Sequence, residues 1–172
     1  MDETGFRLQP VNRRTWAPCG ETPVQRAWDR YDRLSVISAI TVSAQRRRIG
    51  LPFQIHDDNI RTGEVVAFVK QLRRTLRRPL IIIWDRWQVH RAAARQLEAS
   101  RLKNIDFEWL PAYAPELNPV EPRWSHTKFS QMANYVPDDV RHLKRTVRQS
   151  LKKQSANHQL KLSFFKSAKL KP

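Results

Sequence analysis

The chain has 172 residues, 40% of them hydrophobic and 28% charged, which is enough for one globular domain and excludes a disordered chain. Its one cysteine, Cys19, excludes a disulfide framework and a cysteine-ligated zinc site, and is typical of a reducing compartment. Apolar runs such as Leu80–Trp84 are far too short to cross a membrane, and residues 1–10 contain no apolar signal segment.

Charge is the strongest compositional signal. The chain has 32 Lys and Arg against 16 Asp and Glu, a formal net charge of +16, which indicates a polyanionic partner, nucleic acid before an anionic membrane surface. Residues 123–172 carry a net +10 and residues 1–122 carry +6. We therefore expect a mixed-charge body followed by a basic extension, with residues 154–172 partly disordered because their apolar periodicity is weak.

The first predicted elements are two strands. Residues 33–45 are rich in β-branched side chains, and residues 48–56 form a second apolar stretch. A short basic turn joins them, so we expect an antiparallel hairpin. Pro52 predicts that the second strand is irregular or lies at a sheet edge.

Helices and strands alternate after the hairpin. Apolar residues at helical spacing predict a helix that starts at an N-cap, Thr62, and stops before Pro79. The run 80–84 predicts a strand buried on both faces, residues 90–101 a helix, and residues 105–110 a strand parallel to the first.

A proline-rich loop precedes the last two predicted helices. The first runs from about Pro119 to Met132, and the second starts near Pro137 with Asp138 and Asp139 in its first turn. Antiparallel strands followed by β-α-β-α predict an α/β fold, in which helices flank a mixed sheet.

Two carboxylates occupy positions suited to chemistry. Asp85 directly follows the strand 80–84, where it either faces a ligand or caps the next helix in a capping box with Gln88. Glu121 follows Asn118 and Pro119, and this spacing also fits a helix cap without any catalytic role.

The combination of the two carboxylates favours a metal site. A helix, a strand and a loop separate them, and this path can bring Glu121 back beside Asp85. Convergent carboxylates without cysteine suit Mg²⁺ or Mn²⁺. In a strongly basic protein they indicate phosphodiester chemistry with two metal ions ~4 Å apart.

Four segments resemble a known family: MDETGF, RRTWAPCGETP, PLIIIWDRWQVHRA and LPAYAPELNPVEPRW. They resemble the DDE transposase catalytic domain of the mariner-like superfamily, in its bacterial insertion-sequence branch, from residue 2 to about residue 132. The resemblance implies an RNase H-like fold, with residues 1–135 as the catalytic domain and residues 136–172 as a C-terminal helix and basic tail.

The resemblance also implies the site. The family's three acids correspond to Asp2, Asp85 and Glu121, which would bind two Mg²⁺ or Mn²⁺ ions, cleave DNA at transposon ends and join the freed 3′-hydroxyl to target DNA. In the family several apolar residues precede the first aspartate, whereas here only Met1 does, so the first strand looks truncated. Glu3 is an alternative ligand, although strand alternation points it to the opposite face.

The family's helix-turn-helix domain is also missing from this sequence. A second reading frame joined by frameshifting, a decayed remnant and a misplaced start codon all fit. The resemblance implies double-stranded DNA as partner, a separately encoded helix-turn-helix half, a homodimer when active, no membrane, and a location in the bacterial cytoplasm at the nucleoid.

We predict DNA contacts at six basic residues: Arg46, Arg47, Arg48, His90, Arg123 and Lys128. The arginine cluster also fits a solvated hairpin tip. His90 also fits a residue that orients the site, or a partly exposed helix histidine. Two other functions stay open, which are an inactive DNA-binding remnant and a different RNase H-like nuclease such as a junction resolvase.

Overall fold

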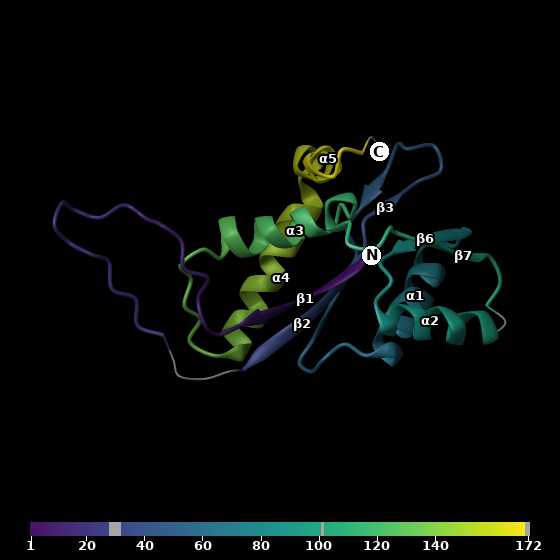
Figure 1. The fold of residues 1–172 in the computed structure, drawn as a ribbon, viewed down its shortest axis with the longest axis horizontal. Helices are drawn as coiled ribbons and strands as arrows, with labels where there is room; N and C mark the ends of the chain where they lie inside the picture. Colours follow the sequence, from purple (N-terminus) through teal and green to yellow (C-terminus); the bar gives the residue numbers. More distant parts are fainter. Residues whose placement is uncertain (28–31, 101, 171–172) are drawn as a thin grey trace.

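The structure, a computed structural model, describes residues 1–27, 32–100 and 102–170. It is a mixed α/β fold with antiparallel and parallel strands, as the sequence predicts (Figure 1). The strands are β1 (Asp2–Arg7), β2 (Arg33–Ser38), β3 (Thr41–Val42), β4 (Ile49–Gly50), β5 (Phe53–His56), β6 (Leu80–Trp84) and β7 (Ile105–Trp109). The α-helices are α1 (Thr62–Leu76), α2 (Gln88–Ala99), α3 (Glu121–His126), α4 (Val140–Ala156) and α5 (His158–Ser167).

The predicted hairpin forms, but each of its arms is broken into two strands. β2 pairs antiparallel with β5, and β3 pairs antiparallel with β4. The break lies at Pro52, whose carbonyl accepts hydrogen bonds from the Ala39 amide at 3.1 Å and from Ser38 Oγ at 2.8 Å. Since proline lacks an amide hydrogen, it ends the regular ladder there.

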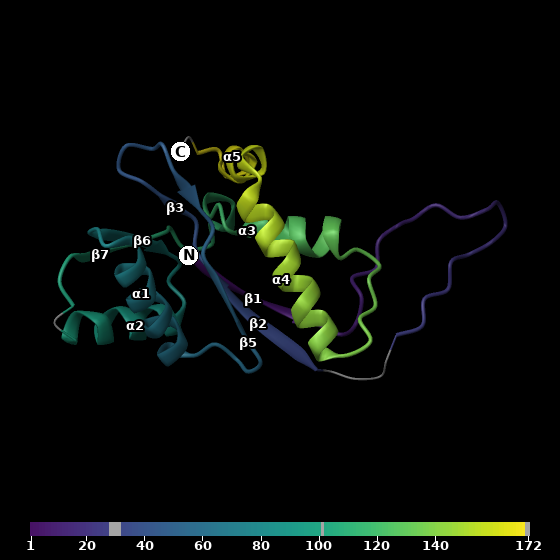
Figure 2. The same cartoon turned by 180° about the vertical axis from the view of Figure 1, so that it is seen from behind.

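β1 joins this hairpin in a three-stranded antiparallel sheet of order β1-β2-β5. Seen from behind in Figure 2, α4 runs across this sheet. Phe6 and Leu34 of the sheet share a core with Leu143, Val147 and Leu151 of α4. The amphipathic helix therefore covers one face of the sheet.

β6 and β7 form a separate parallel pair, packed against α1 and α2. Ile82 and Trp84 are buried in that core, whereas Ile81 is 67% exposed and Ile83 is 52% exposed. The prediction that 80–84 is buried on both faces is therefore wrong. Alternate side chains of a strand point to opposite faces, and the helices cover one of them.

The C-terminal segments differ from the sequence prediction in three places. Asp139 is the N-cap of α4, because its Oδ1 accepts from the His142 amide at 2.6 Å, so the two aspartates precede the helix. The predicted helix 119–132 begins at Glu121 and widens into a π-helical turn over Thr127–Gln131. Instead of being partly disordered, the tail forms α5, because Phe164 and Phe165 are buried.

Residues 12–27 are exposed throughout and extend away from the rest of the molecule (Figure 1). The base of this arm is held near the end of the π-helical turn, where Asn134 Oδ1 accepts from the Arg13 amide at 2.7 Å. Among the described residues, no helix is both long and apolar enough to span a membrane.

Candidate active site

Asp2 is the first residue of β1 and is only 8% exposed. The indole Nε1 of Trp124 donates a hydrogen bond to Asp2 Oδ2 at 3.1 Å. Burial, together with the negative charges of Glu121 and Glu3, raises the pKa of the Asp2 carboxyl to about 7. The structure therefore brings Asp2 and Glu121 close enough to repel each other.

Glu121 is the first residue of α3, and its amide donates to the Asn118 carbonyl at 3.1 Å. Asn118 Oδ1 accepts from the Val120 amide at 3.2 Å, so the asparagine caps the turn before the helix. The predicted capping box from Asn118 to Glu121 is not formed, because the helix starts two residues later than predicted. Glu121 instead lines a shallow pocket with Pro122.

Asp85 follows β6, and its side chain is half exposed. Its Oδ1 accepts two hydrogen bonds, from the Trp87 amide at 2.9 Å and from His90 Nδ1 at 2.6 Å. The bond from His90 lowers the pKa of the Asp85 carboxyl. The alternative capping box with Gln88 is absent here, because Trp87 is the N-cap of α2 and has no side-chain cap.

His90 is fully buried, so the predicted DNA contact at this residue is wrong. Its Nε2 bonds Glu3 Oε2 at 2.9 Å, while Nδ1 bonds Asp85. Although burial acts in the opposite direction, these two bonds raise the pKa of His90 to about 9. Glu3 and Asp2 contact different helices, α2 and α3, as strand alternation predicts.

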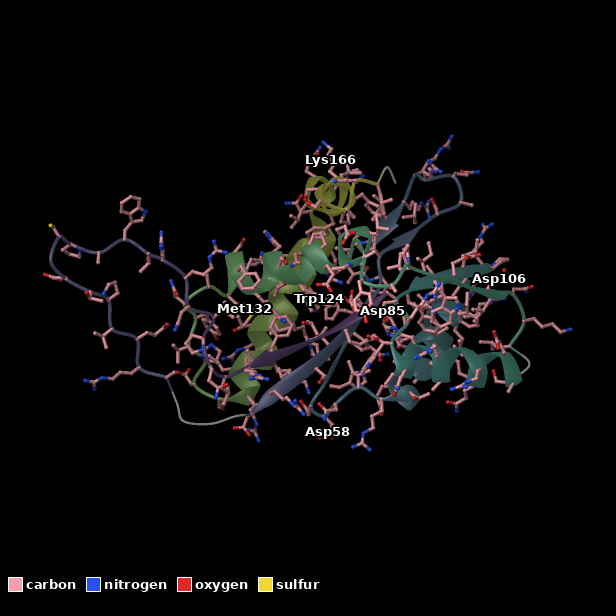
Figure 3. The ribbon with its side chains drawn as sticks, in the orientation of Figure 1. Asp58, Asp85, Asp106, Trp124, Met132 and Lys166 are labelled. Atoms are coloured by element: carbon pink, nitrogen blue, oxygen red, sulfur yellow. The ribbon has the colours of Figure 1, made fainter. Side chains whose placement is uncertain are left out.

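The amino group of Met1 links the start of β1 to the end of β6. It donates a hydrogen bond to the Ile83 carbonyl at 2.9 Å. Burial lowers the pKa of the Met1 amino group, and the negative charges of Asp2, Glu3 and Asp85 act in the opposite direction. Figure 3 shows Asp85 and Trp124 near the start of β1. Asp2 and Glu121 therefore interact through their charges, and Asp85 follows the strand whose end the Met1 amino group joins to β1.

The described residues contain no group of three or more His, Cys, Asp or Glu arranged to hold a metal ion. The chemistry of the donors nevertheless fits a hard divalent cation, because carboxylate oxygens are its preferred ligands. One observation agrees with this fit: Asp2 is buried beside the negative charges of Glu121 and Glu3, and its raised pKa reflects first that burial and then those charges, both of which a bound cation would offset.

Arg123 is also fully buried, and its predicted DNA contact is wrong. Its guanidinium donates to Gln154 Oε1 at 3.2 Å, to the Leu151 carbonyl at 3.4 Å and to Ser38 Oγ. All three partners are neutral, and burial lowers the pKa of Arg123. The residue holds α3 against α4 and β2.

Lys128 lies beside the acids and is partly buried. Its Nζ donates to Thr4 Oγ1 at 2.6 Å, and its burial lowers its pKa, while the charges of Glu121 and Asp2 oppose that change. Arg46, Arg47 and Arg48 are exposed at the tip between β3 and β4.

The sequence interpretation missed two contacts of the site. Trp124 lies three residues after Glu121, which places both on one helix face and indicates a shared site. The bond between Glu3 and His90 joins residues 87 positions apart, and nothing in the local pattern indicates it.

The mixed α/β scaffold, with antiparallel β1, β2 and β5, parallel β6 and β7 and flanking helices, is of the RNase H-like class of fold, which solved structures of similar topology share. Residues 1–144 match the family model for the DDE superfamily endonuclease, so the chain belongs to that family. No curated protein matches it.

Solved structures of the Mos1 transposase share this fold. The mariner Mos1 paired-end complex with Mg has a TM-score of 0.62 at 15% identity, covering 97% of this chain and 50% of that chain. The Mos1 paired-end complex with the left transposon end has a TM-score of 0.57 at 15% identity, covering 98% and 55%. The chain thus spans about half the length of the Mos1 chains it matches.

Proposed function

We propose that the chain is the catalytic domain of a DNA transposase, of the bacterial insertion-sequence type, that cleaves and joins phosphodiesters at transposon ends. The observation that carries the proposal is the buried Asp2 at the start of β1, on which the Glu121 charge acts, together with the bond from the Met1 amino group to the end of β6, which Asp85 follows. Membership of the DDE endonuclease family supports it.

Each of the chain's own groups has a role in this proposal. Asp2, Asp85 and Glu121 would hold two Mg²⁺ or Mn²⁺ ions, which supply activation of the attacking oxygen and stabilisation of the leaving oxygen. Trp124 fixes the Asp2 carboxylate through its indole N–H. Lys128 supplies a cation beside Asp2 and Glu121, where it binds a phosphate oxygen of the DNA.

We propose that double-stranded DNA, both transposon ends and target, lies along the exposed basic surface. The outer side of α4 carries five exposed cations: Arg141, Arg145, Arg148, Lys152 and Lys153. Lys161 of α5 donates to the Ile49 carbonyl at 3.1 Å, so the tail lies beside the hairpin that carries Arg46–Arg48. These cations suit backbone phosphates, which carry no sequence information.

The remaining partners follow from the same proposal. Residues 1–135 form the catalytic domain, and residues 136–172 complete its core through α4 and add a basic surface. In the active form, a second copy of the chain accepts the exposed arm 12–27, where Trp16 is 100% exposed. Recognition of transposon ends by a helix-turn-helix partner, and action at the bacterial nucleoid, belong to the same proposal.

Nicking of supercoiled plasmid by the full chain with Mg²⁺ or Mn²⁺ tests the catalytic role. Asp85→Asn removes one charge from the metal ligands and should lower the nicking rate by about 100-fold or more. Asp106→Asn, at an exposed aspartate of β7, is the matched control and should leave the rate unchanged. Equal nicking by wild type and Asp85→Asn contradicts the proposal.

A second candidate function is DNA binding without catalysis. The net charge of +16 favours it, because charge alone supports salt-dependent binding. It predicts a wild-type protein that binds DNA less tightly as salt rises and nicks no plasmid with either metal. The wild-type arm of the same assay separates the two functions.

A further inference from the structure

His90 has the most constrained environment of the site. Its ring is fully buried in the first turn of α2 and stacks on Trp84, with centroids 5.0 Å apart and planes 13° apart. Trp87 contacts it edge-on at 5.4 Å. The two indoles fix both the position and the plane of the imidazole.

Both ring nitrogens face carboxylates. Nδ1 lies 2.6 Å from Asp85 Oδ1, and Nε2 lies 2.9 Å from Glu3 Oε2. An ionised carboxylate only accepts hydrogen bonds, so both nitrogens donate. One ring therefore ties the residue after β6 to the second residue of β1.

The hydrogen bonds to Asp85 leave part of its carboxylate available. The Trp87 amide and His90 Nδ1 both donate to Oδ1, and among the described residues no hydrogen bond reaches Oδ2. The Asp85 side chain is 51% exposed, so its second oxygen is open to a ligand from solvent. Glu3, only 11% exposed, is enclosed on the other side of the imidazole.

We propose that His90 is a positioning residue, which holds Asp85 in the orientation that binds a divalent cation and is itself held by Glu3. Glu3 is then an anchor for His90 rather than a metal ligand. The inference rests on the proposed function, because it assigns Asp85 to the metal site. Groups that orient metal ligands in this way contribute about 10- to 100-fold to metal affinity or activity.

Two near-isosteric variants separate the two hydrogen bonds. His90→Asn places an amide nitrogen near the position of Nδ1 and keeps the bond to Asp85, whereas His90→Gln reaches the position of Nε2 and keeps only the bond to Glu3. Mn²⁺ affinity of the full chain is measured by the electron paramagnetic resonance signal of free Mn²⁺. Plasmid nicking is measured in parallel, and circular dichroism reports folding.

We expect His90→Gln and His90→Ala to weaken Mn²⁺ binding about 10- to 100-fold, and His90→Asn to restore it to within about fivefold of wild type. Glu3→Gln should weaken it by a smaller factor, because the amide oxygen still accepts from Nε2. The control is His142→Gln, because His142 also bonds an aspartate, Asp138 Oδ2 at 2.7 Å, but lies in α4. It should leave Mn²⁺ affinity unchanged.

Wild-type Mn²⁺ affinity in folded His90→Gln overturns the inference, as does an equal loss in His90→Asn and His90→Gln. If the His90 variants fail to fold, unchanged affinity in Glu3→Gln overturns the role of Glu3 as anchor and with it the inference. Failure of the proposed function looks different, because Asp85→Asn then nicks plasmid as wild type does.

Discussion

Two buried cations, one on each side of the start of β1, show how differently this fold treats a charge. His90 lies between two carboxylates, and its bonds to them raise its pKa to about 9. Arg123 lies among a hydroxyl, an amide and a carbonyl, and burial lowers its pKa. The carboxylates around His90 suit a site that binds charged groups. The neutral partners of Arg123 instead fix the packing of α3 against α4.

The largest expected effect is on the free energy of unfolding and concerns Arg123, whose hydrogen-bond partners are all neutral. Arg123→Ala leaves a cavity and strands three buried partners, so the free energy of unfolding should fall by about 4 kcal/mol. Arg123→Met keeps most of the volume without the charge and should lose less than half as much. Urea denaturation measures both, and an unchanged Arg123→Ala midpoint contradicts this structural role.

A pH-dependent effect on stability is expected from Asp2, which lies at the start of β1 between the surroundings of His90 and of Arg123. Because its folded-state pKa is raised to about 7, its ionisation disfavours folding, and wild-type stability should fall as pH rises from about 4 to 7. In metal-free protein, Asp2→Asn should be about 2 kcal/mol more stable than wild type at pH 8 and no more stable at pH 4.

Thermal unfolding at the two pH values checks the Asp2 prediction. Asp106→Asn is the matched control, since it makes the same chemical change at an exposed aspartate of β7. A stability difference between wild type and Asp2→Asn that is the same at pH 4 and pH 8 contradicts the raised pKa.

The smallest expected effect is on the salt dependence of DNA binding, and it compares the exposed Arg46–Arg48 with the buried Arg123. Replacing Arg46, Arg47 and Arg48 together by alanine should reduce the slope of log affinity against log salt by about 2 to 3, because each phosphate contact contributes about 0.9. Arg123→Met should leave the slope unchanged. Fluorescence anisotropy with a DNA duplex at several salt concentrations measures this slope. Equal slopes in wild type and the triple variant would show that the hairpin tip does not contact DNA.

Local patterns were sufficient for much of the fold. Helical spacing located α1, and the apolar run located β6, because burial of one helix face or one strand leaves a periodic trace in the sequence. Pro52 indicated the irregularity of the hairpin, because proline has no amide hydrogen to donate to the strand ladder. Asp85 and Glu121 were identifiable because they occupy the ends of such elements.

The burial of the two cations was not predictable from local patterns. Each buried cation bonds a residue far along the chain: Glu3 lies 87 residues from His90, and Ser38 lies 85 residues from Arg123. Isolated cations are usually exposed, so a residue-by-residue interpretation assigns both to solvent or DNA. The exposure of Ile81 and Ile83 likewise depends on which face the helices cover, which the run of apolar letters does not show.

The π-helical turn over Thr127–Gln131 sets the helical phase of the segment after the active-site helix. Its amide–carbonyl bond spans five residues, from the Met132 amide to the Thr127 carbonyl at 2.9 Å. In a regular α-helix, Trp124 and Met132 would point about 80° apart, yet both enter the same core. The wider turn absorbs that mismatch, because it accommodates one residue more than a regular α-helical turn does. Deleting one residue from it would therefore leave a regular helix in which Trp124 and Met132, then seven positions apart, still point about 20° from each other and into the core.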